Sequence, residues 1–567
     1  MNLSIVKRPG QAAARLALAF LLGLAHASGA AAPGAAPRPA LVAPPTDAQA
    51  LALRLYASGP APRWLEDGQA LARQGLELLA DAASHGLDPA LYGTQALSGR
   101  LESLRGAQAD AAFGHALSVA MLQYLADLHG GRTASPYRPA ALDGFDPVAQ
   151  LRQALAARHL ARAVDAAAPA IPLYGRVRET LARYRRLARE TAAWPALPPA
   201  EGALAEGSAY AGAAALRERL RLLGDIEDAG AGDADADRYT PALAAAVRRF
   251  QSRHGLEEDG ILGPATYAAL AVPPAHRAAQ LALTLERLRW LPPLHGRIVA
   301  VNVPAYRLWA FETGPGAPPP LEMRVIVGKA AGTPTPLFIG QMRYLEFNPY
   351  WNVPRSIATA EILPSLARDP GWLRRNDMEL VMADGRVADA PGAATLAGLR
   401  AGAVRIRQRP GARNVLGAVK FAMPNPMNIY LHSTAAQELF RRSRRDLSHG
   451  CIRVEDAAAL AQFVLADPLR WNAEGVTAAM RPGATRTVTL AAPVPVVLFY
   501  ATAIVDRHGR ALFAEDIYKR DAPLLRTLRD VNTSPGADTA ARTMEAAQAN
   551  LATGMQHRRF TSEGDAR

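Results

Sequence analysis

The residues with the clearest chemical potential lie in one segment, residues 430–453, which reads YLHSTAAQELFRRSRRDLSHGCIR. It contains Cys451, the only cysteine of the 567-residue chain, two residues after His449 and nineteen after His432. A thiolate attacks carbonyl carbon, whereas a thiol at its ordinary pKa is mostly protonated at neutral pH. A nucleophilic cysteine therefore needs a nearby base or cation and a field that favours the anion. The segment offers both, so we predict Cys451 as a nucleophile and His432 as its base.

The elements expected before the cysteine would hold the base rigidly. His432 closes an apolar, β-prone run at residues 429–431, which predicts a histidine at the end of a buried strand. Thr434 and Gln437 fit a capping box, which predicts a short helix that ends in the arginine-rich run 441–445. This helix is expected to return the chain towards its start.

A second helix is expected after the cysteine. Glu455 and Asp456 would begin it, and Leu460, Phe463 and Val464 would form its apolar face. The cysteine would then lie on the turn before this helix, where it would be exposed.

The turn around the cysteine is expected to stabilise a developing oxyanion. Gly450 permits the backbone geometry that such a turn often needs, and the backbone N–H groups around it would point into a common space. Arg453 adds a fixed positive charge, which suits a substrate carboxylate.

Less specific interpretations of the same residues stay open at this point. A lone cysteine is most often a small buried hydrophobic residue, and a histidine that ends a strand is often a hydrogen-bonded structural residue. His432, His449 and Cys451 are also residue types that bind zinc, but the H-x-C spacing is cramped and no second cysteine supports it. We therefore expect no metal and no cofactor.

A histidine, a spacer and then Ser448-His449-Gly450-Cys451 resemble the signature of the L,D-transpeptidase catalytic domain, which has the YkuD-type fold. The stretches at residues 342–344, 347–354 and 416–426 are similar to the large, periplasmic, multidomain branch of that family. The resemblance implies a cysteine transpeptidase that rebuilds peptidoglycan and that carbapenems acylate at the cysteine.

The resemblance also implies roles for individual residues. Cys451 would be the nucleophile, His432 the general base, and the backbone around His449 and Gly450 the oxyanion site. Ser433 stands where this branch often has Asp, so a backbone carbonyl is the alternative group to orient the base. The residues expected to contact substrate are Arg453, Tyr430, Ser433, Ser448, Trp351 and Tyr350.

The chain as a whole is predicted to be a multidomain α+β protein. The closely spaced strand patterns after residue 297 favour a mainly β, sandwich-like catalytic core, and the helical sequence before it favours a scaffold. The expected parts are a signal peptide (1–27), an Ala/Pro linker (28–45), a helical scaffold (46–200), a three-helix module that resembles peptidoglycan-binding domains (205–275), a connecting helix (276–295), the catalytic domain (296–525) with a helical capping insertion (353–404), and a disordered tail (530–567).

The first residues predict export. Lys7, Arg8 and Arg15 precede an apolar run at residues 16–25 that is short for a membrane span, and the following small residues suit signal peptidase. We therefore expect a periplasmic protein rather than one with an uncleaved inner-membrane anchor. A single cysteine cannot form an internal disulfide in that oxidising compartment. Packing alone therefore does not easily explain a free thiol there, and a chemical role is expected.

The formal net charge of +13 bears on the partners. No basic stripe with interleaved aromatic residues suggests nucleic acid, so an anionic wall polymer is the expected partner. The expected partners are peptidoglycan stem peptides, as tetrapeptide donor and as diamino-acid amine acceptor, and wall synthases.

The expected reaction is acyl transfer that releases D-alanine from a tetrapeptide and forms a 3-3 crosslink. Three alternatives stay open: an L,D-carboxypeptidase, attachment of an envelope protein to the wall, and a non-catalytic wall-binding protein. Papain-like proteases carry cysteine before histidine, which this chain does not.

Overall fold

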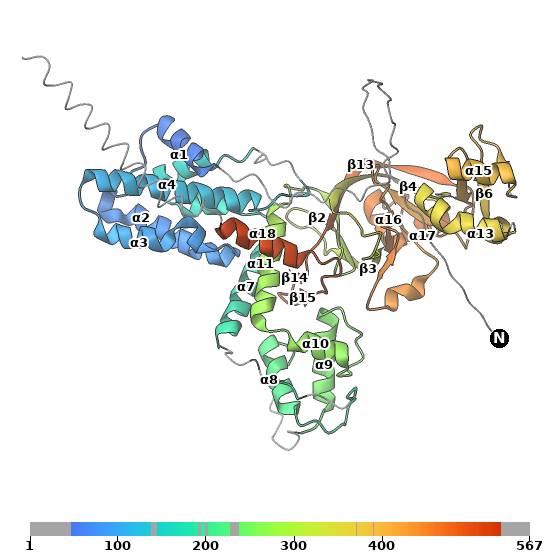
Figure 1. Cartoon of the computed structure of the whole chain (residues 1–567), viewed down its shortest axis with the longest axis horizontal. Helices are drawn as coiled ribbons and strands as arrows, with labels where there is room; N and C mark the ends of the chain where they lie inside the picture. Colours follow the sequence, from blue (N-terminus) through green and yellow to red (C-terminus); the bar gives the residue numbers. More distant parts are fainter. Residues whose placement is uncertain are drawn as a thin grey trace, which may run out of the picture. The chain divides into compact units, whose positions relative to one another are not determined.

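The computed structural model describes residues 47–137, 144–190, 194, 196–198, 202–226, 237–369, 371–388 and 390–533. The predicted signal peptide, the predicted linker and nearly all of the predicted tail lie outside these residues. The chain is a multidomain α+β protein, with helices first and strands later (Figure 1). None of the described helices is both long enough and apolar enough to cross a membrane.

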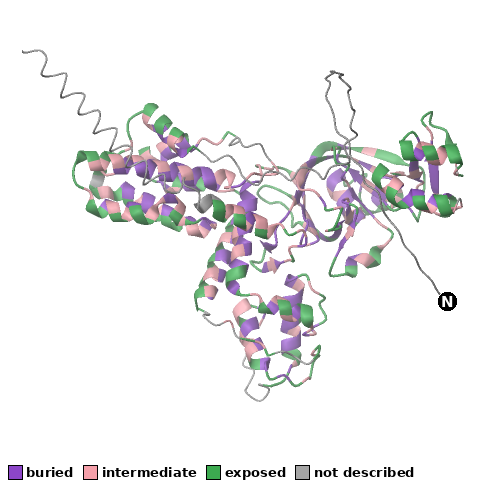
Figure 2. Cartoon of the chain, viewed as in Figure 1, coloured by how far each residue is buried: buried purple, intermediate pink, exposed green. Residues whose placement is uncertain are grey.

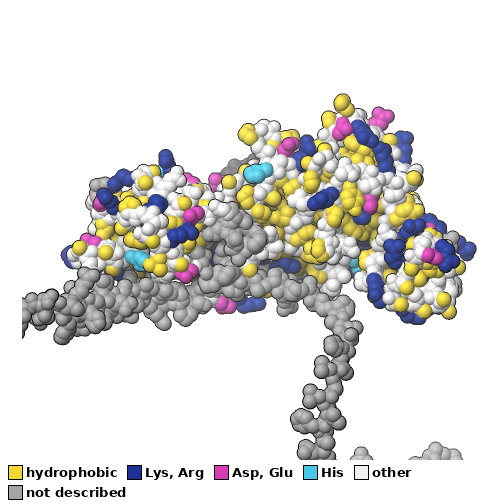
Figure 3. Space-filling view, turned by 90° about the horizontal axis from the view of Figure 1, so that it is seen from above, with side chains coloured by type: hydrophobic (Ala, Val, Ile, Leu, Met, Phe, Trp, Pro, Cys, Tyr) yellow, Lys and Arg dark blue, Asp and Glu magenta, His cyan; other side chains and the backbone are white. Residues whose placement is uncertain are grey.

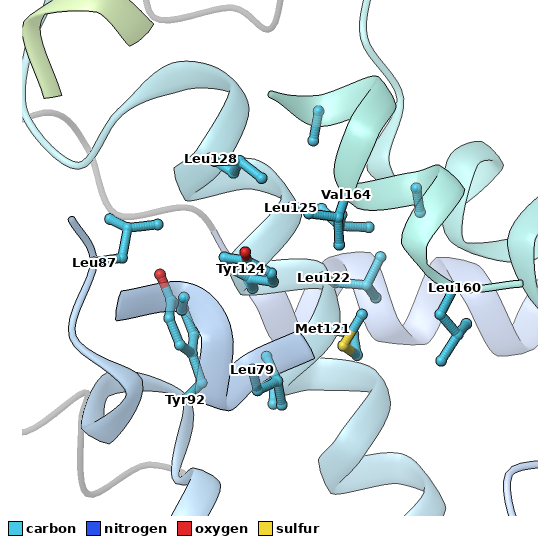
Figure 4. Close-up of a cluster of buried hydrophobic side chains, with 14 of the residues drawn as sticks. Leu79, Leu87, Tyr92, Met121, Leu122, Tyr124, Leu125, Leu128, Leu160 and Val164 are labelled. Atoms are coloured by element: carbon cyan, nitrogen blue, oxygen red, sulfur yellow. The ribbon is translucent and has the colours of Figure 1, made fainter. Parts of the chain in front are cut away.

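The first part is helical and has its own hydrophobic core. The spacing of Leu117, Met121 and Tyr124 predicts that they share one face of a helix. All three are buried in that core, which confirms the helical period of this stretch. Figure 4 shows Met121 and Tyr124 among leucines from neighbouring helices, and Figure 2 shows the buried inward faces. The elements are α1 (Ala48–Ala57), α2 (Glu66–Ala80), η1 (Asp81–His85), η2 (Pro89–Tyr92), α3 (Thr94–Ser103), α4 (Ala107–Gly130), α5 (Pro147–Ala156), α6 (Ala161–Ala167) and α7 (Pro172–Glu190).

A second, smaller core belongs to three helices, α8 (Ala213–Leu223), α9 (Pro241–Arg253) and α10 (Pro264–Ala271). Thr240 begins α9, because its side chain accepts from the N–H of Leu243 and Pro241 needs no hydrogen-bond partner at the first helical position. The spacing of Leu243, Val247 and Phe250 predicts the apolar face of a helix, and all three are buried.

Helix α11 (Pro274–Arg289) follows and is largely buried. Thr284 Oγ1 donates to the carbonyl of Ala503 at 2.6 Å, and Arg287 pairs with Asp521 at 2.7 Å. Ala503 belongs to the hairpin of β14 (Ala503–Val505) and β15 (Ala511–Phe513), which packs into the helical core, and Asp521 begins α18 (Asp521–Thr533). The first residues of the predicted disordered tail are therefore helical.

The main sheet closes on itself. Its order is β11-β3-β12-β10-β9-β4-β13-β1-β2, and β2 also pairs with β3, so the predicted sandwich-like core is a barrel. Helices α16 (Ala457–Leu465) and α17 (Ala473–Met480) follow β12. The strands are β1 (Arg297–Asn302), β2 (Arg307–Glu312), β3 (Leu321–Gly328), β4 (Phe338–Phe347), β9 (Val419–Ala422), β10 (Leu431–His432), β11 (Asp446–Ser448), β12 (Ile452–Val454) and β13 (Arg486–Phe499).

An insertion from β5 to β8 interrupts this barrel, and we call residues 351–408 the insertion. It has a hydrophobic core and, beside its helices, a sheet of order β5-β8-β6-β7 that the helical prediction missed. Its elements are β5 (Trp351–Asn352), α12 (Arg355–Ile357), the π-helix η4 (Ala358–Ile362), α13 (Leu363–Arg368), α14 (Trp372–Arg375), β6 (Met378–Val381), β7 (Val387–Ala388), α15 (Ala393–Ala401) and β8 (Arg405–Gln408).

Two local predictions were wrong. The sequence at residues 494–499 and 501–505 predicts a hairpin or paired strands. Residues 494–499 instead belong to β13, which lies between β1 and β4, while β14 pairs with β15. The predicted capping-box helix is only the 3-10 turn η5 (Gln437–Arg441), because Thr434 Oγ1 accepts from the N–H of Ala436 and makes a local turn.

Candidate active site

Two neighbouring strands bring the predicted nucleophile and base together. Strand β10 pairs with β12 in parallel, with Leu431 opposite Ile452 and His432 opposite Arg453, and the N–H of Ile452 donates to the carbonyl of Tyr430 at 3.1 Å. Since side chains alternate along a strand, this register sets Cys451 beside Tyr430 and on the face that carries His432. Cys451 is thus diagonal to His432 across adjacent strands.

His432 is buried and neutral. Its Nδ1 lies 2.7 Å from the carbonyl oxygen of Ser433, so an N–H at Nδ1 donates to that carbonyl and Nε2 is left as the acceptor. Burial, followed by the charge of Arg453, lowers the pKa of His432 to about 3. Interactions with the backbone of Ser433 and Leu416 oppose this lowering of the pKa only in part. A neutral imidazole with an unprotonated Nε2 is the form that accepts a proton.

The side chain of Ser433 is engaged inside the protein. Its hydroxyl donates to the carbonyl of Leu416 at 3.0 Å and accepts from the N–H of Val419 at 3.0 Å. Ser433 is buried, so it leaves no open hydroxyl for a substrate, and its carbonyl is the group that orients His432.

Cys451 is half-buried, less exposed than the sequence predicts, and it is followed directly by β12 rather than by a helix. Its Sγ lies 3.5 Å from the carbonyl oxygen of Asn428. Burial raises the pKa of the thiol, and hydrogen bonds from Tyr430 and the charges of Lys420 and Arg453 oppose that rise only in part. The resting group is therefore a neutral thiol, whereas we expected a field that favours the anion.

The turn before Cys451 is rigid. Gly450 has a φ of +112°, which side-chain-bearing residues rarely adopt. Ser448 Oγ donates to the carbonyl of Cys451 at 2.5 Å and accepts from the N–H of Gly450 at 3.1 Å, while Thr335 Oγ1 donates to the carbonyl of Gly450 at 2.8 Å. The predicted oxyanion donor at Gly450 is thus occupied, and Ser448 holds the turn. The N–H of Cys451 has no partner within the described ranges.

His449 and Arg453 differ in their surroundings. His449 is exposed, and its Nε2 lies 2.7 Å from Oε1 of Glu361, a residue of the insertion. Arg453 is half-buried, and its Nε has no hydrogen-bond partner in the part of the chain that the structure describes. Burial lowers the pKa of Arg453, and the interaction with Cys451 opposes this.

A pocket of about 460 Å³ opens between the barrel and the insertion. Tyr350 and Tyr430 line it, as does Lys420, whose Nζ lies 5.1 Å from the centre of the Tyr430 ring. Trp351 is half-buried against the core of the insertion and is not part of the lining. The sequence interpretation missed Lys420 and Asn428, although the motif at residues 416–426 and the chain before Tyr430 carry them.

No three His, Cys, Asp or Glu side chains are grouped to hold a metal ion among the residues with described positions.

Family models match three stretches of the chain. Residues 296–496, which include His432 and Cys451, match the YkuD model of the L,D-transpeptidase catalytic domain. The chain contains an L,D-transpeptidase catalytic domain. Residues 50–181 match the model of a scaffold domain, and residues 211–270 match a model described as "Putative peptidoglycan binding domain". The resemblance inferred from the sequence is thereby confirmed.

Two curated proteins are similar to parts of the chain. A curated Haemophilus influenzae protein named "Putative L,D-transpeptidase" is 31% identical over 253 residues, which is 45% of this chain and 50% of that protein. The zinc D-Ala-D-Ala carboxypeptidase of Streptomyces albus G is 46% identical over 66 residues, 12% of this chain and 25% of that protein. The chain thus spans half or less of the length of these two relatives.

Two crystal structures of L,D-transpeptidases also match. The structure from Xylanimonas cellulosilytica is 18% identical and covers 53% of this chain and 100% of its own, with a TM-score of 0.16. The structure from Stackebrandtia nassauensis is 14% identical and covers 54% of this chain and 97% of its own, with a TM-score of 0.21.

Proposed function

We propose that this protein is a peptidoglycan L,D-transpeptidase that forms 3-3 crosslinks through a thioester on Cys451. The observation that carries the proposal is the position of Cys451 diagonal to a neutral, buried His432 on adjacent strands of a domain that matches the L,D-transpeptidase family. A nucleophile beside an oriented base is the arrangement that acyl transfer requires.

The first half-reaction would acylate the enzyme. Nε2 of His432 takes the proton of the Cys451 thiol as the sulfur attacks the carbonyl between the diamino acid and the terminal D-alanine of a tetrapeptide. The oxyanion accepts a hydrogen bond from the free N–H of Cys451. When the C–N bond breaks, His432 returns the proton to the departing amine, and D-alanine leaves.

The second half-reaction would complete the crosslink. The amine of another stem attacks the thioester, His432 takes a proton from that amine, and the carbon–sulfur bond breaks. The leaving thiolate regains the proton from His432. Both half-reactions begin from a neutral thiol or amine and a neutral imidazole, which fits the raised pKa of Cys451 and the lowered pKa of His432.

The other parts would serve this reaction in the periplasm. The stretch that matches the peptidoglycan-binding model would bind peptidoglycan, and the helices before it would act as a scaffold. Residues 1–27 would direct export. Arg453, with an unpartnered buried Nε beside the thiol, would bind substrate, and Tyr430 and Tyr350 would line its groove.

The test is mass spectrometry of purified tetrapeptide muropeptides after incubation with the protein. We expect crosslinked dimers with wild type, dimers of the same amount after chelator treatment, and none with Cys451→Ala. Monomers that are shortened by one D-alanine, without dimers, would instead indicate a carboxypeptidase. No change with folded wild-type protein would contradict the proposed reaction, and activity that chelator removes would contradict the cysteine mechanism.

A further inference from the structure

The pocket beside the thiol has an unbalanced charge. Its lining includes Arg355, Arg405 and Lys420, and none of its fifteen lining residues is Asp or Glu. We call this space the cationic pocket. In Figure 3, Lys and Arg side chains gather on the lobe at the right-hand end, the side on which Figure 1 labels α13, α15 and β6.

Two of the three charges lack a carboxylate partner. Lys420 Nζ lies 2.8 Å from Oε2 of Glu346, which neutralises it. The side chain of Arg355 donates only to the carbonyl of Arg400, at 3.0 Å, and the side chain of Arg405 has no hydrogen-bond or ion-pair partner among the described residues. Both arginines are exposed, so their guanidinium groups are free to meet a ligand.

The arginines that follow on the same strand and loop behave differently. Arg407 and Arg409 both pair with Glu379, and Arg413 pairs with Asp377 at 2.8 Å. Each of these three arginines therefore has a carboxylate partner, whereas Arg355 and Arg405 at the cationic pocket have none among the described residues.

The cationic pocket adjoins the reacting atoms. Tyr430 and Asn428 belong to its lining, and the carbonyl oxygen of Asn428 lies 3.5 Å from Sγ of Cys451. Lys420 lies opposite His432 in the antiparallel register of β9 and β10, so both side chains project from the same face of the sheet. A stem peptide at the thiol would thus extend along the cationic pocket.

We propose that Arg355 and Arg405 form a carboxylate-binding site for the stem peptide. Planar guanidinium groups bind carboxylates through paired, charge-assisted hydrogen bonds. The matching ligand is a stem whose diamino acid keeps a second carboxylate, rather than one in which that group is absent or amidated. The identity of the ligand rests on the proposed function. Binding of that ligand to the two arginines does not require turnover.

The experiment measures binding, so it does not depend on catalysis. The full-length Cys451→Ala protein is titrated with synthetic stem peptides that carry the second carboxylate or the corresponding carboxamide. We expect the carboxylate peptide to bind about three- to tenfold more tightly, with a ratio that shrinks at high salt, because both arginines are exposed. Added Arg405→Gln or Arg355→Gln should bring the ratio close to one, and Arg405→Glu should invert it.

The matched control is Arg374→Gln, an exposed arginine of α14 in the same insertion that lies outside the cationic pocket. It should keep the wild-type ratio. Separate titrations with the tetrapeptide donor and the tripeptide acceptor tell which stem supplies the carboxylate.

Two results would overturn the site. One is an equal affinity for carboxylate and carboxamide peptides, and the other is a preference that survives both Arg405→Gln and Arg355→Gln. Loss of crosslinking in the muropeptide assay, with the binding preference intact, would refute the proposed reaction and not this site.

Discussion

Two buried histidines, His432 in the barrel and His85 in the helical domain, have nearly the same electrostatic character. The pKa of each is lowered to about 3, in both cases first by burial and then by the charge of neighbouring arginine. Nδ1 of each is hydrogen-bonded, to the Ser433 carbonyl in one case and to the Tyr174 hydroxyl at 3.0 Å in the other.

The neighbours separate the two histidines. His85 lies among the rings of Tyr124 and Tyr174, within a core cluster of helices. His432 lies one strand away from the only thiol of the chain and next to residues that line a pocket. A shifted pKa is therefore no sufficient mark of an active site in this protein, because burial alone produces it.

The largest expected effect is the loss of activity when His432 is replaced, compared with the same replacement of His85. His432→Asn should lower kcat/KM for crosslinking about 10²- to 10⁴-fold, because the proton of the attacking thiol loses its acceptor. His85→Asn should leave kcat/KM near the wild-type value but lower the free energy of unfolding by about 1–3 kcal/mol, since a buried hydrogen-bonding group is disturbed. Muropeptide kinetics and urea unfolding measure the two quantities.

Equal losses of activity in the two folded variants would break the distinction. They would show that both histidines act through the stability of the fold.

A smaller effect concerns the charge state of the thiol. Because the pKa of Cys451 is raised above its ordinary value of 9.0, the thiolate forms only as pH rises beyond that value. The rate of alkylation by iodoacetamide should therefore keep rising past pH 9. The single cysteine makes the reaction specific, and the urea-unfolded protein provides the unshifted reference.

A preformed thiolate–imidazolium pair would give a different profile. Alkylation would then be fast and nearly independent of pH between 6 and 8, and His432→Asn would abolish that plateau. This outcome would contradict the neutral resting pair.

Much of the site could be predicted from the sequence where a short pattern carries the chemistry. The order of His432 and Cys451, and the apolar run before His432, correctly predicted a strand-borne histidine. The sequence also predicted the apolar face of α16. In the structure Leu460 and Val464 are buried, Phe463 is half-buried, and Asp456 caps the helix.

Other features depend on contacts that a local pattern does not contain. Strand β12 has only three residues, which is too few to show the alternation of apolar and polar side chains that marks a strand. The sequence therefore did not predict this strand between Cys451 and α16. The raised pKa of the thiol follows from burial by the surrounding fold, and the unpaired state of Arg355 and Arg405 depends on which acids the insertion brings near them.

The most direct test of the central claim is the intact mass of the protein after incubation with a tetrapeptide donor without acceptor, followed by acid quench and peptide mapping. We predict an added mass equal to the donor minus D-alanine, on the peptide that contains Cys451, and no addition in Cys451→Ala. Release of D-alanine by folded wild-type protein without any adduct at Cys451, and with the same rate in Cys451→Ala, would contradict the account.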